Sequence, residues 1–81
     1  MFINVRVNSV LAQEMGASRL RVQVDGPASV TDLLDELRRQ YPNSAEMLSQ
    51  VIPIVDGQHV PPTDDIAEGQ EVDLLMPVAG G

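Results

Sequence analysis

The chain has 81 residues, a formal net charge of −7, no cysteine, and five basic residues that are all arginine. A chain of this length forms one small domain that buries only about 60–65% of its unfolded surface, which leaves no room for a deep internal active site. The lack of cysteine excludes disulfides, thiolate metal sites and a persulfide carrier, while the negative charge argues against a nucleic-acid partner and for a basic protein partner.

No apolar run approaches the roughly 20 residues that a helix needs to span a bilayer. The N-terminus enters an alternating strand pattern at once, without the features of a secretory signal. We therefore expect a protein that has no membrane partner and that works in the cytoplasm.

The first predicted strand covers residues 3–7, where apolar and polar residues alternate with a period of two. Residues 9–18 follow as a predicted loop with one helical turn, which Gly16 stops. A second half-buried strand is predicted at 19–24, and the turn residues at 25–27 end it.

A helix is predicted from its N-cap, Ser29, to Tyr41, just before Pro42. Asp32 lies at the third helical position, near the positive end of the helix dipole, and the cap should contribute about 1 kcal/mol. The apolar residues of this helix form one continuous stripe: Val30, Leu33, Leu34, Leu37 and Tyr41.

Residues 45–50 form a predicted short helical segment that packs under the edge of the sheet. A short apolar strand is predicted at 52–55. Asp56 and Gly57 then indicate a two-residue hairpin turn, with 58–60 as the returning strand.

Pro53 cannot donate a hydrogen bond to a neighbouring strand, so we expect its strand to have an unpaired side at that point. Further along, residues 63–65 are predicted to form a turn, and Ile66 is expected to fill part of the core. The last predicted strand covers 71–76, after a glycine-containing turn at 68–69.

The predicted order is β-β-α-β-β-β, which indicates an α+β fold. One main helix across one face of a mixed sheet of about five strands buries these apolar sets and leaves the other face of the sheet to solvent or a partner. We expect a domain at residues 1–76 and an extended tail at 77–81. The predicted core is formed by Ile3, Val5, Leu20, Val22, Leu33, Leu34, Leu37, Val72 and Leu74.

The chain ends with Gly80 and Gly81, after Pro77, which ends sheet pairing and stiffens the exit from the last strand. Two glycines place no side chain near the terminal carboxylate, so this end can enter a channel too narrow for any Cβ. The carboxylate has a pKa of roughly 3.5 and is ionised at neutral pH, so it reacts only after another enzyme activates it. The alternative is an ordinary frayed terminus without a function.

Alternation along the last strand puts Val72 and Leu74 on one face and Leu75 on the other. If the first two face the helix, Leu75 lies exposed beside the tail, where a docking enzyme would find an apolar anchor. Single exposed leucines are also common without a function. The predicted docking residues are Leu75, Pro77, Val78, Ala79 and Gly80.

No conventional catalytic set can be assembled from this sequence. His59 is the only histidine and falls in a short hairpin strand, and without cysteine a zinc site is improbable. Asp64 and Asp65 are adjacent acids without further ligands, which is typical of a solvated turn. We expect no metal site, and by elimination the reactive atom is the terminal carbonyl carbon of Gly81.

Taken together, these features resemble the MoaD/ThiS family of ubiquitin-like β-grasp sulfur carriers. The resemblance covers nearly the whole chain and is carried by the first strand, the capped helix, residues 54–57, the segment 66–72 and the ending 76–81. The length and the Pro-Val-x-Gly-Gly ending are most similar to the small subunit of molybdopterin synthase. The first strand departs from that pattern, because its open face carries Asn4, Arg6 and Asn8 where such carriers tend to show apolar residues.

The resemblance implies a carrier subunit that is not an enzyme by itself and that binds no cofactor. A ubiquitin-activating-type adenylyltransferase would consume ATP to adenylate Gly81. A sulfur donor, a rhodanese or a cysteine desulfurase, would then convert the adenylate to a thiocarboxylate. The acceptor enzyme would be one such as the molybdopterin synthase large subunit, with cysteine, thiamine or tRNA-thiolation pathways and a ubiquitin-like protein modifier as alternatives.

Overall fold

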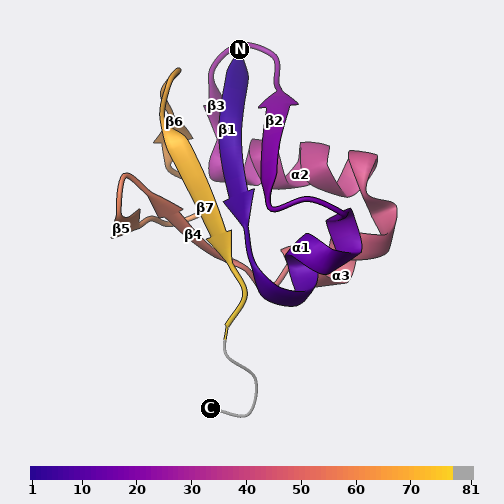
Figure 1. Ribbon diagram of the computed structural model, residues 1–81. Helices are drawn as coiled ribbons and strands as arrows, with labels where there is room; N and C mark the ends of the chain where they lie inside the picture. Colours follow the sequence, from indigo (N-terminus) through magenta and orange to yellow (C-terminus); the bar gives the residue numbers. More distant parts are fainter. Residues whose placement is uncertain (78–81) are drawn as a thin grey trace.

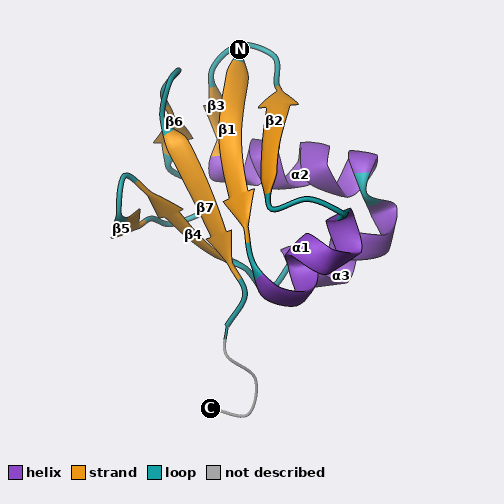
Figure 2. Ribbon diagram, in the orientation of Figure 1, coloured by secondary structure: helices purple, strands orange, loops and turns teal. Residues whose placement is uncertain are grey.

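A computed structural model describes residues 1–77 and shows helices covering one face of a mixed five-stranded sheet (Figures 1 and 2). The strand order is β2-β1-β7-β4-β5. Strands β1 and β7 run parallel, while the other neighbours are antiparallel, which confirms the predicted fold. The bounds are β1 Phe2–Val7, β2 Arg19–Gln23, β4 Ile52–Val55, β5 Gln58–His59 and β7 Glu71–Leu75.

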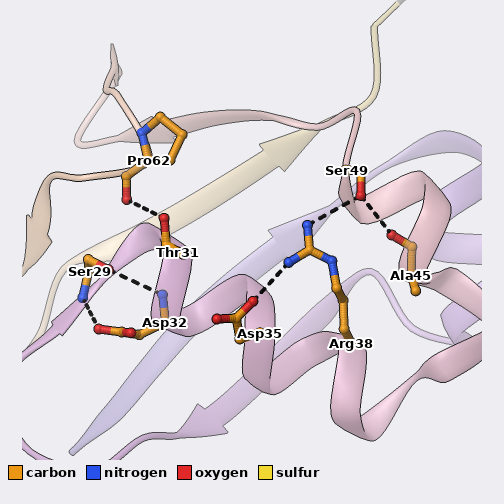
Figure 3. Close-up of polar contacts among 8 residues, drawn as sticks. All are labelled: Ser29, Thr31, Asp32, Asp35, Arg38, Ala45, Ser49 and Pro62. Atoms are coloured by element: carbon orange, nitrogen blue, oxygen red, sulfur yellow. Dashed lines mark hydrogen bonds and ion pairs between the residues drawn. The ribbon is translucent and has the colours of Figure 1, made fainter.

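Helix α2, Val30–Gln40, is the main helix and passes behind β1 and β2 in Figure 1. Its predicted N-cap is confirmed, because the Asp32 N–H donates to Ser29 Oγ at 3.2 Å and the Ser29 N–H donates to Asp32 Oδ2 at 2.9 Å (Figure 3). The two bonds satisfy backbone donors that a helix start otherwise leaves without partners. The buried stripe comprises Val30, Leu33, Leu34 and Leu37.

A second, two-stranded sheet holds the start of α2, and the sequence did not predict it. Strand β3, Ala28–Ser29, pairs antiparallel with β6, Asp65–Ile66, so the expected turn at 63–65 is wrong at its last residue. The Thr31 N–H and Oγ1 both donate to the Pro62 carbonyl, at 2.9 and 3.0 Å, and Figure 3 shows the bond from Oγ1. Two-residue strands show no periodicity, so only their pairing across the fold reveals them.

Residues 9–18 contain a seven-residue helix, α1, Ser9–Met15, where we expected a loop with one turn. Leu11 and Met15 are buried on one side of it, and Gly16 ends it with a φ of 77° and an N–H bond to the Ala12 carbonyl at 2.9 Å. A helix this short is unstable alone and forms because its apolar face packs on the core. Two apolar positions were too few to predict it.

The predicted helical segment near residue 45 is confirmed with shorter bounds. A 3₁₀ turn, η1, covers Pro42–Ser44, and helix α3 covers Ala45–Leu48. Leu48 is the residue that it buries, at 1% exposure. Arg38 ties this segment to α2, because its guanidinium donates to Ser49 Oγ at 3.3 Å and to Asp35 at 3.0 Å (Figure 3).

The core lies between the sheet and the helices, and every predicted core residue is buried except Leu20, which is half-buried. Leu20 belongs to β2, which is an edge strand of the sheet and is therefore covered on fewer sides. Ile66 is buried as expected, at 3% exposure.

Pro53 pairs with Leu74 of β7 on one side, and on the other side the β4–β5 ladder stops at Ile54 and His59, before the proline. The Pro53 carbonyl still accepts from the Val60 N–H at 3.2 Å, just beyond the end of β5.

Candidate functional site

The chain leaves the fold from the middle of the sheet. Strand β7 is bonded to β1 on one side and to β4 on the other, and it ends at Leu75, one residue earlier than predicted. At the end of β1 the backbone turns into α1, so it no longer pairs with β7. The side chain of Asn8 supplies the next acceptor instead, because its Oδ1 accepts from the Met76 N–H at 3.1 Å. The first residue after the strand is therefore held in line with β7.

Pro77 follows Met76, is exposed, and has no N–H to donate. The remaining predicted site residues, Val78, Ala79, Gly80 and Gly81, lie outside the described residues. Within residues 1–77, the structure thus shows the two residues that follow β7, of which Met76 is bonded to Asn8 and Pro77 is exposed.

The face of the sheet opposite the helices, here called the open face, carries Leu75 next to the exit. Leu75 is 38% exposed, and it lies directly opposite Ile52 of β4, which is 36% exposed. Ile54, two residues along β4, lies on the same face and is half-buried. We call these three residues the apolar spot. Sequence reasoning missed Ile52, because the alternation of its strand does not show which residue of β7 it pairs with.

The centre of the open face holds a network of charges around Arg6. Its guanidinium donates to both carboxylate oxygens of Asp73, at 3.0 and 3.3 Å, and lies 3.6 Å from a carboxylate oxygen of Glu71. The hydrogen bond to Asp73 is the main reason that the pKa of Arg6 is raised, and the charges of Asp73 and Glu71 add to it. The three side chains join β1 to β7 across the face, beside the apolar spot.

A hollow of about 320 Å³ lies at the end of the open face where the chain leaves β7. It is open to solvent and lined by Arg6, Val7, Asn8, Ser18, Arg19, Asp73 and Leu75. Five of the seven lining residues are polar, and two of them carry guanidinium groups. The arrangement is suited to contact with another protein's side chains and has no enclosed space for a small-molecule reaction.

The other candidates from the sequence divide between this face and the second sheet. His59 is exposed on β5 and lies directly opposite Ile54 of the apolar spot, on the open face. Asp65 is part of the second sheet, with its neighbour Asp64 exposed beside it. Across residues 1–77, no three histidine or carboxylate side chains gather closely enough to hold a metal ion. No helix in that part of the chain is long and apolar enough to cross a membrane.

Comparison with protein families matches residues 5–81 to the ThiS family. Among curated proteins, small archaeal modifier protein 1 of Haloferax volcanii is 32% identical over 79 residues, which cover 88% of this chain and 91% of that protein. The crystal structure of that protein matches this fold with a TM-score of 0.86 at 27% identity, with 100% of both chains covered.

Two more distant structures share the fold. A putative molybdopterin converting factor subunit 1 from Pyrococcus furiosus has a TM-score of 0.86 at 20% identity, covering 96% of this chain and 99% of its own. A complex of subunits 1 and 2 of the molybdopterin-converting factor from Helicobacter pylori matches with a TM-score of 0.70 at 16% identity and full coverage of both chains. At these identities the likeness concerns the fold.

Proposed function

This chain belongs to the ThiS family of ubiquitin-like carrier and modifier proteins, and we propose that it is a sulfur carrier whose C-terminal Gly81 is adenylated and then converted to a thiocarboxylate. The observation that carries the proposal is the exit of the chain from β7, held by Asn8 beside the apolar spot. Such an exit presents a diglycine end to a partner while the fold stays intact. In this proposal residues 1–76 are the body and 77–81 are the delivered tail.

The chemistry needs a partner at each step, because the chain has no cysteine and no catalytic set in its described part. A carboxylate oxygen of Gly81 attacks the α-phosphorus of ATP and pyrophosphate leaves, which gives an acyl adenylate. A persulfide on a rhodanese or a cysteine desulfurase then attacks the carbonyl carbon and displaces AMP, which gives an acyl persulfide. A thiol of the partner cleaves the S–S bond of that intermediate, which leaves the thiocarboxylate on Gly81 and a disulfide on the partner. Because the chain has no thiol, it can carry transferable sulfur only at its terminus, so the acceptor enzyme must take the sulfur from Gly81.

Molybdopterin synthesis is the pathway we propose first, with the synthase large subunit as the acceptor enzyme. Support comes from the length and the Pro-Val-x-Gly-Gly ending. Pathways of cysteine or thiamine synthesis or of tRNA thiolation would use the same activated terminus, because the acceptor enzyme alone decides where the sulfur goes.

A second candidate is a ubiquitin-like protein modifier, and the 32% identity to a protein named as a modifier favours it. Activation would be the same, but a lysine of a target protein would attack the adenylate or a thioester made from it. The chain has no lysine of its own. It would therefore be attached to other proteins without offering a side-chain amine for a second copy.

Intact-mass spectrometry of the protein purified from its own cells tests these alternatives. A mass increase equal to exchanging one oxygen for sulfur at the terminus supports the carrier, and covalent adducts through Gly81 support the modifier. Deletion of Gly81, or one residue added after it, should abolish activation and leave the unfolding midpoint unchanged. A terminus that stays an unmodified carboxylate with ATP, the adenylyltransferase and a sulfur donor would refute both.

A further inference from the structure

The charges of this protein are divided between its two sides. Three of the five arginines, Arg6, Arg19 and Arg21, project from β1 and β2 onto the open face, since Arg6 pairs with Arg19 and Asn4 with Arg21 across the two strands. Of the twelve acidic residues, only Glu71 and Asp73 belong to strands on that face. The net charge of −7 therefore comes from the rest of the chain, which has two arginines and ten acidic residues, and not from the open face.

Two of these arginines lack an acidic partner within the described chain. Arg6 is neutralised by Asp73, but across residues 1–77 no carboxylate oxygen lies within 4.0 Å of the guanidinium of Arg19 or Arg21. Arg21 packs over the ring of Phe2, with its Cζ 4.1 Å from the ring centroid. Both arginines are exposed.

The charge of Arg19 contributes no ion pair to the described part of the fold. Arg19 lies directly opposite Arg6 in an antiparallel pair, an arrangement in which like charges are destabilising, and Asp73 and Glu71 offset only the charge of Arg6. Folding would be served as well or better by an uncharged residue at this position. The charge is therefore better explained by something that binds to the face than by the stability of the sheet.

Arg19 and Leu75 line the same hollow, at the end of the face where the chain leaves β7. The two residues lie on strands that are separated only by β1, so the strands run about 10 Å apart. Leu75 lies two residues further along β7 than Asp73, which is level with Arg19. The face thus offers a cationic half on β2 and an apolar half on β7 and β4, with the start of the tail beside the apolar half.

We propose that the open face binds the enzyme that activates Gly81 through an acidic segment of that enzyme. Its carboxylates lie opposite Arg19 and Arg21 on β2, and an apolar side chain of the same enzyme covers Leu75 on β7 and Ile52 on β4. This inference rests on the proposed function. A phosphate backbone fits less well, because the rest of the surface is strongly acidic and the apolar spot would have no counterpart in it.

The division of charge also orients this protein as it approaches the activating enzyme. The acidic surface around the helices repels an acidic partner, while the arginines on the open face attract it, so the two proteins meet with the tail directed at the enzyme. The expectation of a basic partner, drawn from the net charge, is therefore replaced for this face by an acidic one.

The test compares two double variants that have the same net charge. R19Q/R21Q removes both arginines from the open face, and R38Q/R39Q removes two from the far side of the molecule, on α2. The affinity of each for the adenylyltransferase of the same organism is measured by calorimetry without ATP, and the KM for each is measured by ATP–pyrophosphate exchange. We expect R19Q/R21Q to raise Kd and KM roughly tenfold with kcat unchanged, and R38Q/R39Q to leave all three unchanged.

Salt provides a second readout, because attraction between exposed charges is screened. The Kd of the unaltered protein should rise with ionic strength, and that of R19Q/R21Q should lose most of this dependence. Equal Kd values for the two double variants would overturn the inference, and so would binding of single-stranded RNA that depends on Arg19 and Arg21. Binding that depends on these arginines without any pyrophosphate exchange would refute the proposed function alone.

Discussion

The two faces of the central sheet are built from the same strands, yet they differ in nearly every physical property. The face toward the helices is apolar and closed. The open face carries ion pairs, the apolar spot and two arginines that have no acidic partner among residues 1–77. Leu74 and Leu75 are neighbours in β7, but Leu74 is fully buried and Leu75 is 38% exposed. One step along a strand therefore separates a residue that stabilises the fold from one available for recognition.

The largest expected effect comes from truncating these two leucines separately. Leu74→Ala should lower the free energy of unfolding by about 2–5 kcal/mol, because it leaves a cavity in the core. Leu75→Ala is the matched control with the same chemical change, and it should cost less than about 1 kcal/mol. Denaturant titration measures both.

The effect of these two alanine variants on binding should be the reverse of their effect on stability. Leu75→Ala should weaken binding to the adenylyltransferase, and Leu75→Glu should weaken it further, because a charge would have to be desolvated in the contact. Unchanged affinity for both the activating and the acceptor enzyme would make Leu75 an ordinary surface residue and remove the apolar spot from the site.

A smaller effect is expected on the covered side, at the start of α2. Ser29→Ala removes the acceptor for the Asp32 N–H and should cost about 1 kcal/mol of stability, without changing affinity for the activating enzyme. Ser29→Asp keeps an acceptor at the cap and serves as the control. A loss of affinity in the alanine variant would show that the two sides of the sheet are coupled.

The bond that holds the start of the tail can be tested without any partner. Asn8→Ala removes the acceptor for the Met76 N–H, so hydrogen exchange at that amide should become roughly two- to tenfold faster. Asn8→Asp keeps an oxygen in reach and should change the exchange rate less. The measurement is amide exchange by NMR, and equal rates in all three proteins would mean that Asn8 does not hold the tail.

The smallest effect concerns pH and lies on the helix side. The hydrogen bond from Arg39, with a second from Gln40, lowers the pKa of Glu36. A carboxyl whose pKa is lower in the folded state stabilises the fold above its unfolded pKa of about 4.3, and this contribution is lost as the pH falls through the folded value.

Glu36→Gln should therefore reduce the loss of stability between neutral and acid pH, by a small amount because the pair is exposed. Thermal midpoints of the two proteins across that range measure the difference. A steeper loss of stability in the variant would contradict the sign of the pKa change.

Much of the fold could be predicted because long elements repeat their pattern. The capped helix from Ser29 shows a complete apolar stripe, and the strands at 3–7 and 71–75 alternate cleanly, so elements and faces agree with the structure. Short elements failed for the opposite reason. Helix α1 has two buried positions, and strands β3 and β6 have two residues each, which is too little for a period to appear.

The candidate site divides in the same way. The sequence by itself determined the diglycine end, the absence of thiols and lysines, and the outward position of Leu75, because these depend on composition and on alternation within one strand. Only the tertiary structure decided that Ile52 lies opposite Leu75, that Asn8 holds Met76, and that Arg19 lies opposite Arg6. Pairing between strands far apart in the sequence depends on register, which local patterns along a single strand do not contain.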